Sequence, residues 1–167
     1  AVVANHAADS TLNGKCISEI NILKGRKPKV KEEAETILDL MLAGGAQMVY
    51  HSMSEKDVQA FMKYPFNMVG ADAGVSTGRG MPHPRTYGTN ARVLGRYVRE
   101  QQIISLEEAI RRMTSLAAQK FQLKDRGLIR EGMAADIVVF NEAEVTDNAT
   151  FENPHQFSKG FQFILVN

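Results

Sequence analysis

The spacing of hydrophobic residues alternates between two patterns along the chain, and each pattern predicts a different element. Apolar residues recur every three or four positions in several stretches, which is the spacing of one helix face. We therefore predict helices over residues 17–28, 31–45, 54–65, 91–102 and 105–121. Short apolar runs predict strands over residues 1–5, 46–51 and 66–72. Such alternation is typical of a parallel α/β architecture.

Polar residues mark the starts of two of these helices. Ser54 is suited to be an N-cap, Asp57 follows three residues later, and Pro65 ends the same stretch. Ser105 and Glu108 have the spacing of a capping box, in which each side chain hydrogen-bonds to the backbone N–H of the other residue. The predicted apolar face of residues 91–102 consists of Val93, Leu94, Tyr97 and Val98.

The pattern changes near Arg126 and Gly127, where we expect a domain boundary. Residues 127–140 resemble a hairpin and residues 161–167 another strand, with no helix between them. Residues 1–126 and 127–167 are therefore expected to belong to different domains. So few strands cannot close a barrel, and we expect the chain to be part of a larger fold.

Composition is typical of a globular protein. Of the 167 residues, 44% are hydrophobic and 23% are charged. The net charge of +1 favours neither nucleic acid nor an anionic membrane as a partner, and no apolar run approaches the roughly 20 residues of a membrane helix. Residues 1–10 do not have the pattern of a signal peptide. Cys16, the single cysteine, cannot form an internal disulfide, which favours a reducing, cytoplasmic setting.

Asp72 is the first candidate for chemistry. It follows an apolar run and precedes a loop rich in glycine and proline. Catalytic groups of parallel α/β folds project from the C-terminal ends of strands. A carboxylate there can ligate a divalent metal or accept a proton from metal-bound water. The alternative is an Asx turn before Gly74.

Arg85 and His83 belong to a His-Pro-Arg triplet that follows Asp72 in the same loop. The flanking prolines limit the freedom of the loop, which favours a fixed guanidinium able to bind a carboxylate through two hydrogen bonds. A solvated loop arginine is the alternative. No second metal ligand is paired with His83 in the sequence.

Other motifs are absent or uninformative. The four histidines do not have the spacing of a zinc motif, and neither a GxSxG nor a P-loop sequence occurs. A complete zinc site is therefore not predicted. Arg92, Arg96 and Arg99 lie on one face of a predicted helix, and we interpret them as a solvated face rather than a nucleic-acid contact.

Longer motifs resemble one protein family. The run GADAG…GRGMPHPRTYGTNARVLGRYVRE resembles the corresponding stretch of the N-acyl-D-amino-acid deacylases, or D-aminoacylases. The resemblance continues through SLEEAIRRMTSLAAQKFQLKDRGLIREGMAADIVVFN and VTDNATFENPHQFSKGFQFILVN. It covers nearly the whole chain, most securely from Met53 onward. The shorter pattern GLIREGMAADIVVF is common to the wider amidohydrolase superfamily.

The resemblance implies a metal-dependent hydrolase (β/α)8 barrel, or TIM barrel, joined to a small β-rich domain. Residues 1–126 would form the last third of the barrel, and residues 127–167 would be strands of the small domain. The implied reaction is zinc-dependent hydrolysis of an N-acyl-D-amino acid to a carboxylate and a free D-amino acid. By resemblance, Asp72 ligates zinc and acts as general base, whereas Arg85 and the adjacent His83 bind the substrate, Arg85 through its α-carboxylate.

The chain departs from the family in three respects. Ala71-Asp72-Ala73 stands where the family has Ser-Asp-Gly, and Thr89-Asn90-Ala91-Arg92 stands where it has Thr-Phe-Pro-Arg. The family's other metal ligands lie upstream of this chain. The resemblance therefore implies that the isolated chain is inactive, and that the N-terminal part of the enzyme completes the barrel as a second polypeptide unless the chain is a fragment. Two alternatives are an amidohydrolase for a related or cyclic amide and a non-catalytic interaction module.

Overall fold

The computed structural model describes residues 1–75 and 77–167, and contacts divide the chain into two compact units. The first unit comprises residues 1–52, 74–84 and 150–155, and the second comprises residues 53–73, 85–149 and 156–167. Each unit has its own hydrophobic core. Asp72 and Arg85 belong to the second unit, whereas His83 belongs to the first.

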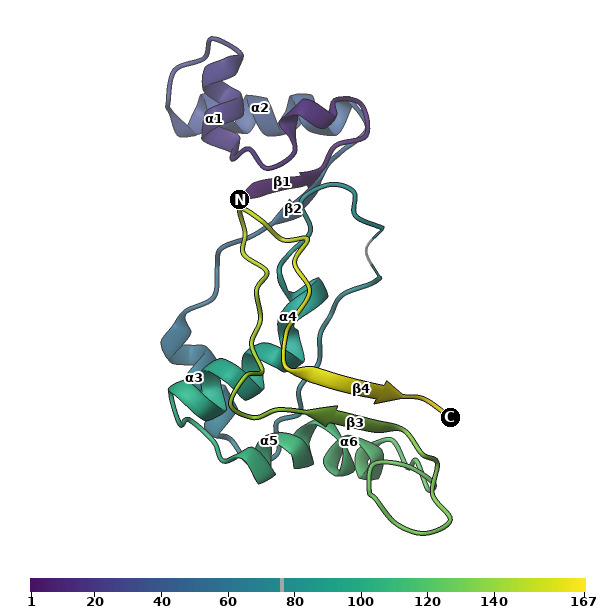
Figure 1. Cartoon of the computed structure of the whole chain (residues 1–167). Coiled ribbons are helices and arrows are strands. Elements are labelled where there is room, and N and C mark those ends of the chain that lie inside the picture. Colours follow the sequence, from purple (N-terminus) through teal and green to yellow (C-terminus); the bar gives the residue numbers. More distant parts are fainter. Residues whose placement is uncertain (76) are drawn as a thin grey trace. The chain divides into compact units, whose positions relative to one another are not determined.

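The first unit combines a two-stranded sheet with helices (Figure 1). Strands β1 (Val2–Asn5) and β2 (Gln47–Val49) are separated in sequence by the 3-10 helix η1 (Ser10–Leu12) and the helices α1 (Ile17–Leu23) and α2 (Val30–Leu42). The core of this unit is formed by Val3, Ile17, Ile20 and Leu40. These elements confirm the strands and helices predicted for this part of the sequence.

The pairing of β1 with β2 differs from the expected parallel arrangement. The two strands are antiparallel, with Val2 opposite Val49 and Val3 opposite Met48. Parallel pairs are slightly less stable per residue and occur mainly within larger sheets that are buried on both faces. A sheet of two strands has no such neighbours, which favours the antiparallel arrangement.

The second unit consists of five helices and one two-stranded antiparallel ribbon among its described residues (Figure 1). The helices are α3 (Glu55–Lys63), α4 (Arg85–Arg92), the π-helix η2 (Val93–Glu100), α5 (Leu106–Met113) and α6 (Ser115–Lys120). The ribbon pairs β3 (Ile137–Phe140) with β4 (Phe161–Leu165). The core consists of Ala91, Val93, Leu94, Tyr97, Val98, Ala109 and Val145, which confirms the apolar face predicted for residues 91–102.

The helix predicted at residues 105–121 is interrupted at Thr114, which separates α5 from α6. The N-terminal cap of α5 is confirmed in one of its two hydrogen bonds. The Ser105 hydroxyl accepts from the backbone N–H of Glu108 at 3.2 Å. The Glu108 carboxylate is bound instead by Arg111 and Arg112. The sequence pattern therefore located the helix start correctly but not the partner of Glu108.

The strand predicted at residues 66–72 is wrong for this chain. Residues 67–75 form no regular element, and Phe66 is largely exposed. The backbone turns immediately after α3, where the Asn67 N–H donates to the Tyr64 carbonyl at 3.2 Å and the Asn67 side chain donates to the Phe61 carbonyl at 3.0 Å. A buried strand needs neighbouring strands to satisfy its backbone groups, and no described segment pairs with this one.

The hairpin predicted at residues 127–140 is also wrong. Only its second arm forms a strand, β3, and that strand pairs with β4, which lies more than 20 residues further along the sequence. The first arm is held as a loop, since Met133 N–H donates to the Arg130 carbonyl at 3.2 Å and Ala134 N–H donates to the Asp125 carbonyl at 2.8 Å. The local residues predicted that β3 is a strand, but they did not predict that its partner is β4.

Close packing fixes η2 against the loop that precedes β4. A Cβ atom added at Gly95 would lie 2.6 Å from the Val145 carbonyl oxygen, which is shorter than real contacts allow. We expect Gly95→Ala to destabilise the folded protein by about 1–3 kcal/mol, because the helix or the loop must move. Urea unfolding measures this change. Gly70→Ala is the control, since a Cβ there meets no atom within 4 Å; equal losses in both variants would contradict the packing argument.

Candidate active site

Asp72 and Arg85 form an ion pair within the second unit. The Arg85 guanidinium lies 2.8 Å from a carboxylate oxygen of Asp72. The side chains are 87% exposed for Asp72 and 45% exposed for Arg85, so both remain reachable by a ligand. The structure thus brings together two of the three residues that the sequence singled out.

Local backbone geometry presents the Asp72 side chain. Its φ of 45° is in the left-handed region, which few residues other than glycine adopt and in which aspartate is enriched. Val69, three residues before, packs against the core of the second unit. The Asp72 carboxylate therefore lies three residues after a side chain that is packed on the core.

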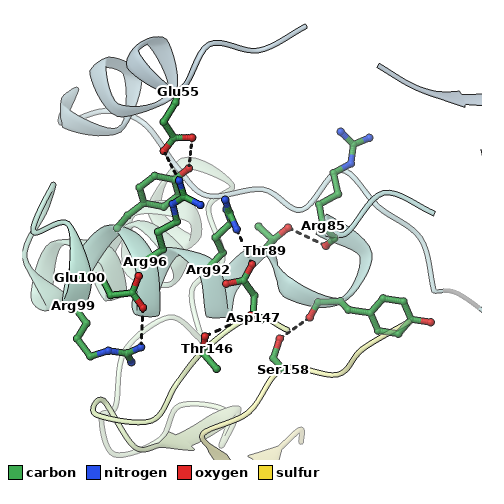
Figure 2. A network of polar contacts seen from close by, with 12 residues as sticks. Glu55, Arg85, Thr89, Arg92, Arg96, Arg99, Glu100, Thr146, Asp147 and Ser158 are labelled. Carbon is green, nitrogen blue, oxygen red and sulfur yellow. Dashed lines mark hydrogen bonds and ion pairs between the residues drawn. The ribbon is translucent and has the colours of Figure 1, made fainter. Parts of the chain in front are cut away.

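Arg85 is the first residue of α4. Its backbone carbonyl accepts a hydrogen bond from the Thr89 hydroxyl at 2.9 Å, as Figure 2 shows. Pro84 precedes it, and the N–H that proline lacks costs the helix no internal hydrogen bond, because the first N–H groups of a helix have no intrahelical partner. The position of the guanidinium therefore depends on how firmly the helix itself is held.

A polar network fixes this helix and its continuation, η2 (Figure 2). Arg92 donates to the Asp147 carboxylate at 2.9 Å, and Arg96 lies 3.7 Å from the Glu55 carboxylate. Burial acts to lower the pKa of Arg92, but hydrogen bonds to Asp147 and Tyr97 outweigh it, so the pKa lies above its ordinary value. Burial is also the main cause that raises the pKa of Tyr97. At neutral pH the Arg92 guanidinium is therefore charged and the Tyr97 hydroxyl is neutral.

The interpretation of Arg92, Arg96 and Arg99 as a solvated face is wrong. Arg99 donates to the backbone carbonyls of Val145 at 2.6 Å and Glu142 at 2.9 Å, while Arg92 and Arg96 face acidic side chains. The arginines pack against segments far away in the sequence. Helical spacing alone could not show that a loop with suitable acceptors lies on this face.

His83 contacts aromatic residues of the first unit. Its ring meets Phe151 edge-on, with ring centroids 5.0 Å apart, and His51 packs on Phe151 with centroids 4.4 Å apart. No sequence pattern indicated this contact, because the three residues come from three separate stretches. A substrate-binding role for His83 stays a prediction.

The described residues contain no group of three or more His, Cys, Asp or Glu side chains that could hold a metal ion. Asp72 offers one accessible carboxylate, a ligand type that zinc accepts. Its chemistry is compatible with one position of a metal site, and the described residues do not supply a complete set of ligands around it.

Glu108 is the centre of a cluster that the functional interpretation of the sequence missed. Its carboxylate binds Arg111 Nε and Arg112 Nε, each at 2.7 Å. Hydrogen bonds from Arg111 and Arg112 lower the pKa of Glu108 to about 2. The spacing of three and four residues was the available signal, since such pairs face each other on a helix.

An open, mostly apolar hollow of about 1230 Å³ adjoins Ala71 and Arg85 in the second unit. Its walls come from α4, η2, α5, α6, residues 127–140 and β4. They include the side chains of Leu94, Leu106, Ile110, Met113, Phe161 and Ile164. Among the residues that the structure describes, no helix has the length and apolar character needed to cross a membrane.

Comparisons with known proteins identify the family. The model of the amidohydrolase family matches residues 19–161, so the chain belongs to that family. It is 44% identical over 122 residues to N-acyl-D-aspartate deacylase of Alcaligenes xylosoxydans xylosoxydans, which covers 73% of this chain and 24% of that protein. It is 37% identical over 156 residues to D-aminoacylase of the same organism, covering 93% of this chain and 30% of that protein.

Solved structures confirm the fold class. The crystal structure of N-acyl-D-glutamate deacylase from Bordetella bronchiseptica, complexed with zinc and a phosphonate inhibitor, superimposes with a TM-score of 0.87 at 32% identity. The match covers 99% of this chain and 33% of that chain. The α/β fold is thus that of one part of these enzymes, and the resemblance read from the motifs is confirmed. The chain spans about a quarter to a third of the length of these relatives.

Proposed function

We propose that this chain is the C-terminal part of a zinc-dependent N-acyl-D-amino-acid deacylase. The enzyme would hydrolyse the amide bond to give a carboxylate and a free D-amino acid. The observation that carries the proposal is the Asp72–Arg85 pair, which places a carboxylate beside a carboxylate-binding cation in a chain similar to such deacylases over nearly its whole length.

Asp72 is proposed as one zinc ligand and as the general base. Zinc, when bound, would polarise the amide carbonyl and make water more acidic. The carboxylate of Asp72 takes a proton from the attacking water and then donates it to the nitrogen of the leaving amine. Water adds to the carbonyl carbon and forms the new C–O bond first. The C–N bond then breaks, so the nitrogen leaves as the protonated free amine and the acyl group is released as a carboxylate.

Arg85 is proposed to bind the α-carboxylate of the substrate. A guanidinium binds a carboxylate through two parallel hydrogen bonds, and Arg85 already binds one carboxylate, that of Asp72. The substrate carboxylate would take over this role from Asp72. His83, from the same triplet, is proposed as a further substrate contact.

The rest of the enzyme is proposed to cover apolar surface that this chain exposes. Phe163 is 62% exposed and Ile164 66% exposed on β4, and Ile164 also lines the open apolar hollow. Residues 1–126 would belong to the barrel and residues 127–167 to the small β domain. The N-terminal part could then be supplied by the same polypeptide or by a second one, and the free Cys16 favours a reducing compartment such as the cytoplasm.

An assay with matched substrates tests the proposal. The zinc-loaded protein, with its barrel complete, is offered N-acetyl-D-glutamate, N-acetyl-D-methionine, their L-enantiomers and a cyclic amide. We expect release of the D-amino acid at least about 100-fold faster than of the L-amino acid, and its loss when a chelator removes the metal. Hydrolysis confined to the cyclic amide would support the alternative amidohydrolase activity. No hydrolysis of any substrate would leave a non-catalytic module as the better account.

A further inference from the structure

The segment that leads to Asp72 is held where it leaves α3. Arg112 donates a hydrogen bond to the Met62 carbonyl, and Arg111 donates to the Pro65 carbonyl at 2.9 Å. Both acceptors belong to the last turn of α3 and the turn after it, which leaves their carbonyls without partners inside the helix. Two arginines of α5 therefore bind the backbone shortly before the candidate base.

One carboxylate holds both arginines in place. Glu108 binds Arg111 through two hydrogen bonds of 2.7 and 2.8 Å, and its Oε1 also accepts from Arg112 Nε at 2.7 Å. The Arg112 side chain is only 4% exposed, so its charge depends on these partners. An arginine buried to this degree is fixed in orientation, unlike an arginine in a surface ion pair.

The connection from this cluster to Asp72 is short and supported along its length. Asn67 is bonded back to α3 through Tyr64 and Phe61, and Val69 packs on the core that also contains Ala109 of α5. Asp72 follows three residues after Val69. No regular element holds residues 67–72, so their placement depends on these contacts.

The same helix also holds the other half of the candidate site. α5 packs against η2, which continues from α4 and its first residue, Arg85. α5 is therefore the common support for the segment before Asp72 and for the helix that bears Arg85.

We propose that Arg112, held by Glu108 and assisted by Arg111, is a positioning residue that sets the place of Asp72 relative to Arg85. The three side chains act on Asp72 through the backbone of residues 62–72. The expected effect on catalysis rests on the proposed function. The restraint of residues 62–72 by the arginines does not depend on the proposed function.

Arg112→Met in the zinc-loaded, complete enzyme tests the inference. A misplacement of about 1 Å can lower a rate about 100-fold, so we expect kcat to fall about 10- to 100-fold while KM changes less than about threefold. Arg112→Lys keeps the charge but can reach fewer acceptors, and it should recover part of the loss. If Arg112→Met does not fold, Arg111→Met tests the same connection through Pro65.

Arg26→Met is the matched control. Arg26 is also partly buried, with its side chain 26% exposed, and it binds Thr36 and Asp39, each at 2.8 Å, within the first unit, which contains neither Asp72 nor Arg85. Both variants should lower the melting temperature, and only Arg112→Met should lower kcat beyond about threefold. Equal losses of kcat in the two variants, or an unchanged kcat in folded Arg112→Met, would overturn the positioning role.

Hydrogen exchange separates this inference from the proposed function. Peptides covering residues 62–72 should exchange faster in Arg112→Met than in Arg26→Met, whatever the enzyme hydrolyses. If the wild type hydrolyses no N-acyl-D-amino acid yet this difference appears, the proposed function fails and the restraint stands. If hydrolysis is found but exchange is the same in both variants, the restraint fails and the proposed function stands.

Discussion

Asp72→Asn should lower kcat for N-acyl-D-amino acids by about 1,000-fold or more in the complete, zinc-loaded enzyme. An amide accepts no proton from water, and loss of general acid–base catalysis alone costs about 100- to 10,000-fold. The amide is also a weaker metal ligand than a carboxylate, so zinc should be removed by a chelator at a lower concentration. Steady-state kinetics and a chelator titration measure the two effects separately.

The control for this change is Asp57→Asn, which neutralises another aspartate of the second unit. Asp57 lies in the first turn of α3, exposed and outside the Asp72–Arg85 pair. Its kinetic constants should stay within about twofold of the wild type, as surface substitutions usually have small effects. An Asp72→Asn enzyme that kept its kcat with normal zinc content would exclude this residue as both base and ligand.

Arg85→Ala should lower kcat/KM for N-acyl-D-amino acids by about 100-fold or more. The guanidinium is proposed to bind the substrate's α-carboxylate, and a charge-assisted, two-bond contact of this kind is among the strongest polar contacts in proteins. Amide substrates in which the α-carboxylate is replaced by a neutral group should be hydrolysed as by the wild type. The measurement is the ratio of kcat/KM for the two substrates in each variant.

Two further variants sharpen this experiment. Arg85→Lys keeps the positive charge but cannot form two parallel hydrogen bonds, so its kcat/KM should fall between those of Arg85→Ala and the wild type. Lys124→Ala removes an exposed cation of the second unit that lies outside the pair and outside the lining of the hollow, so kcat/KM for both substrates should stay unchanged. Equal losses of kcat/KM for the charged and neutral substrates in Arg85→Ala would mean that Arg85 does not bind the α-carboxylate.

Helices were the elements that the sequence predicted well. Residues 31–45 contain most of α2, and residues 54–65 contain all of α3. The hydrogen bonds of a helix join residues four apart, so spacing and capping residues act within the helix itself. Two helix bounds differ from the prediction. The helix predicted from residue 91 begins at Arg85 as α4 and continues as η2, and Thr114 separates α5 from α6.

Strands were predicted less well because their partners are distant in the sequence. The run 66–72 is as apolar as a buried strand, yet it remains irregular, since no described segment pairs with it. β3 was expected to pair with residues just before it and pairs with β4 instead. A strand is completed only by a neighbour, and local residues carry little information about which neighbour that is.

The sequence by itself determined the family, the helices and the two residues, Asp72 and Arg85, on which the proposed chemistry depends. These follow from ordered motifs and from spacing within short segments. Only the tertiary structure showed that Arg85 pairs with Asp72, that Arg92 and Arg99 bind a distant loop, and that Glu108 joins two arginines to the end of α3. The physical reason is that side-chain contacts act only over a few ångströms. Which distant segments come that close is decided by the packing of the whole unit.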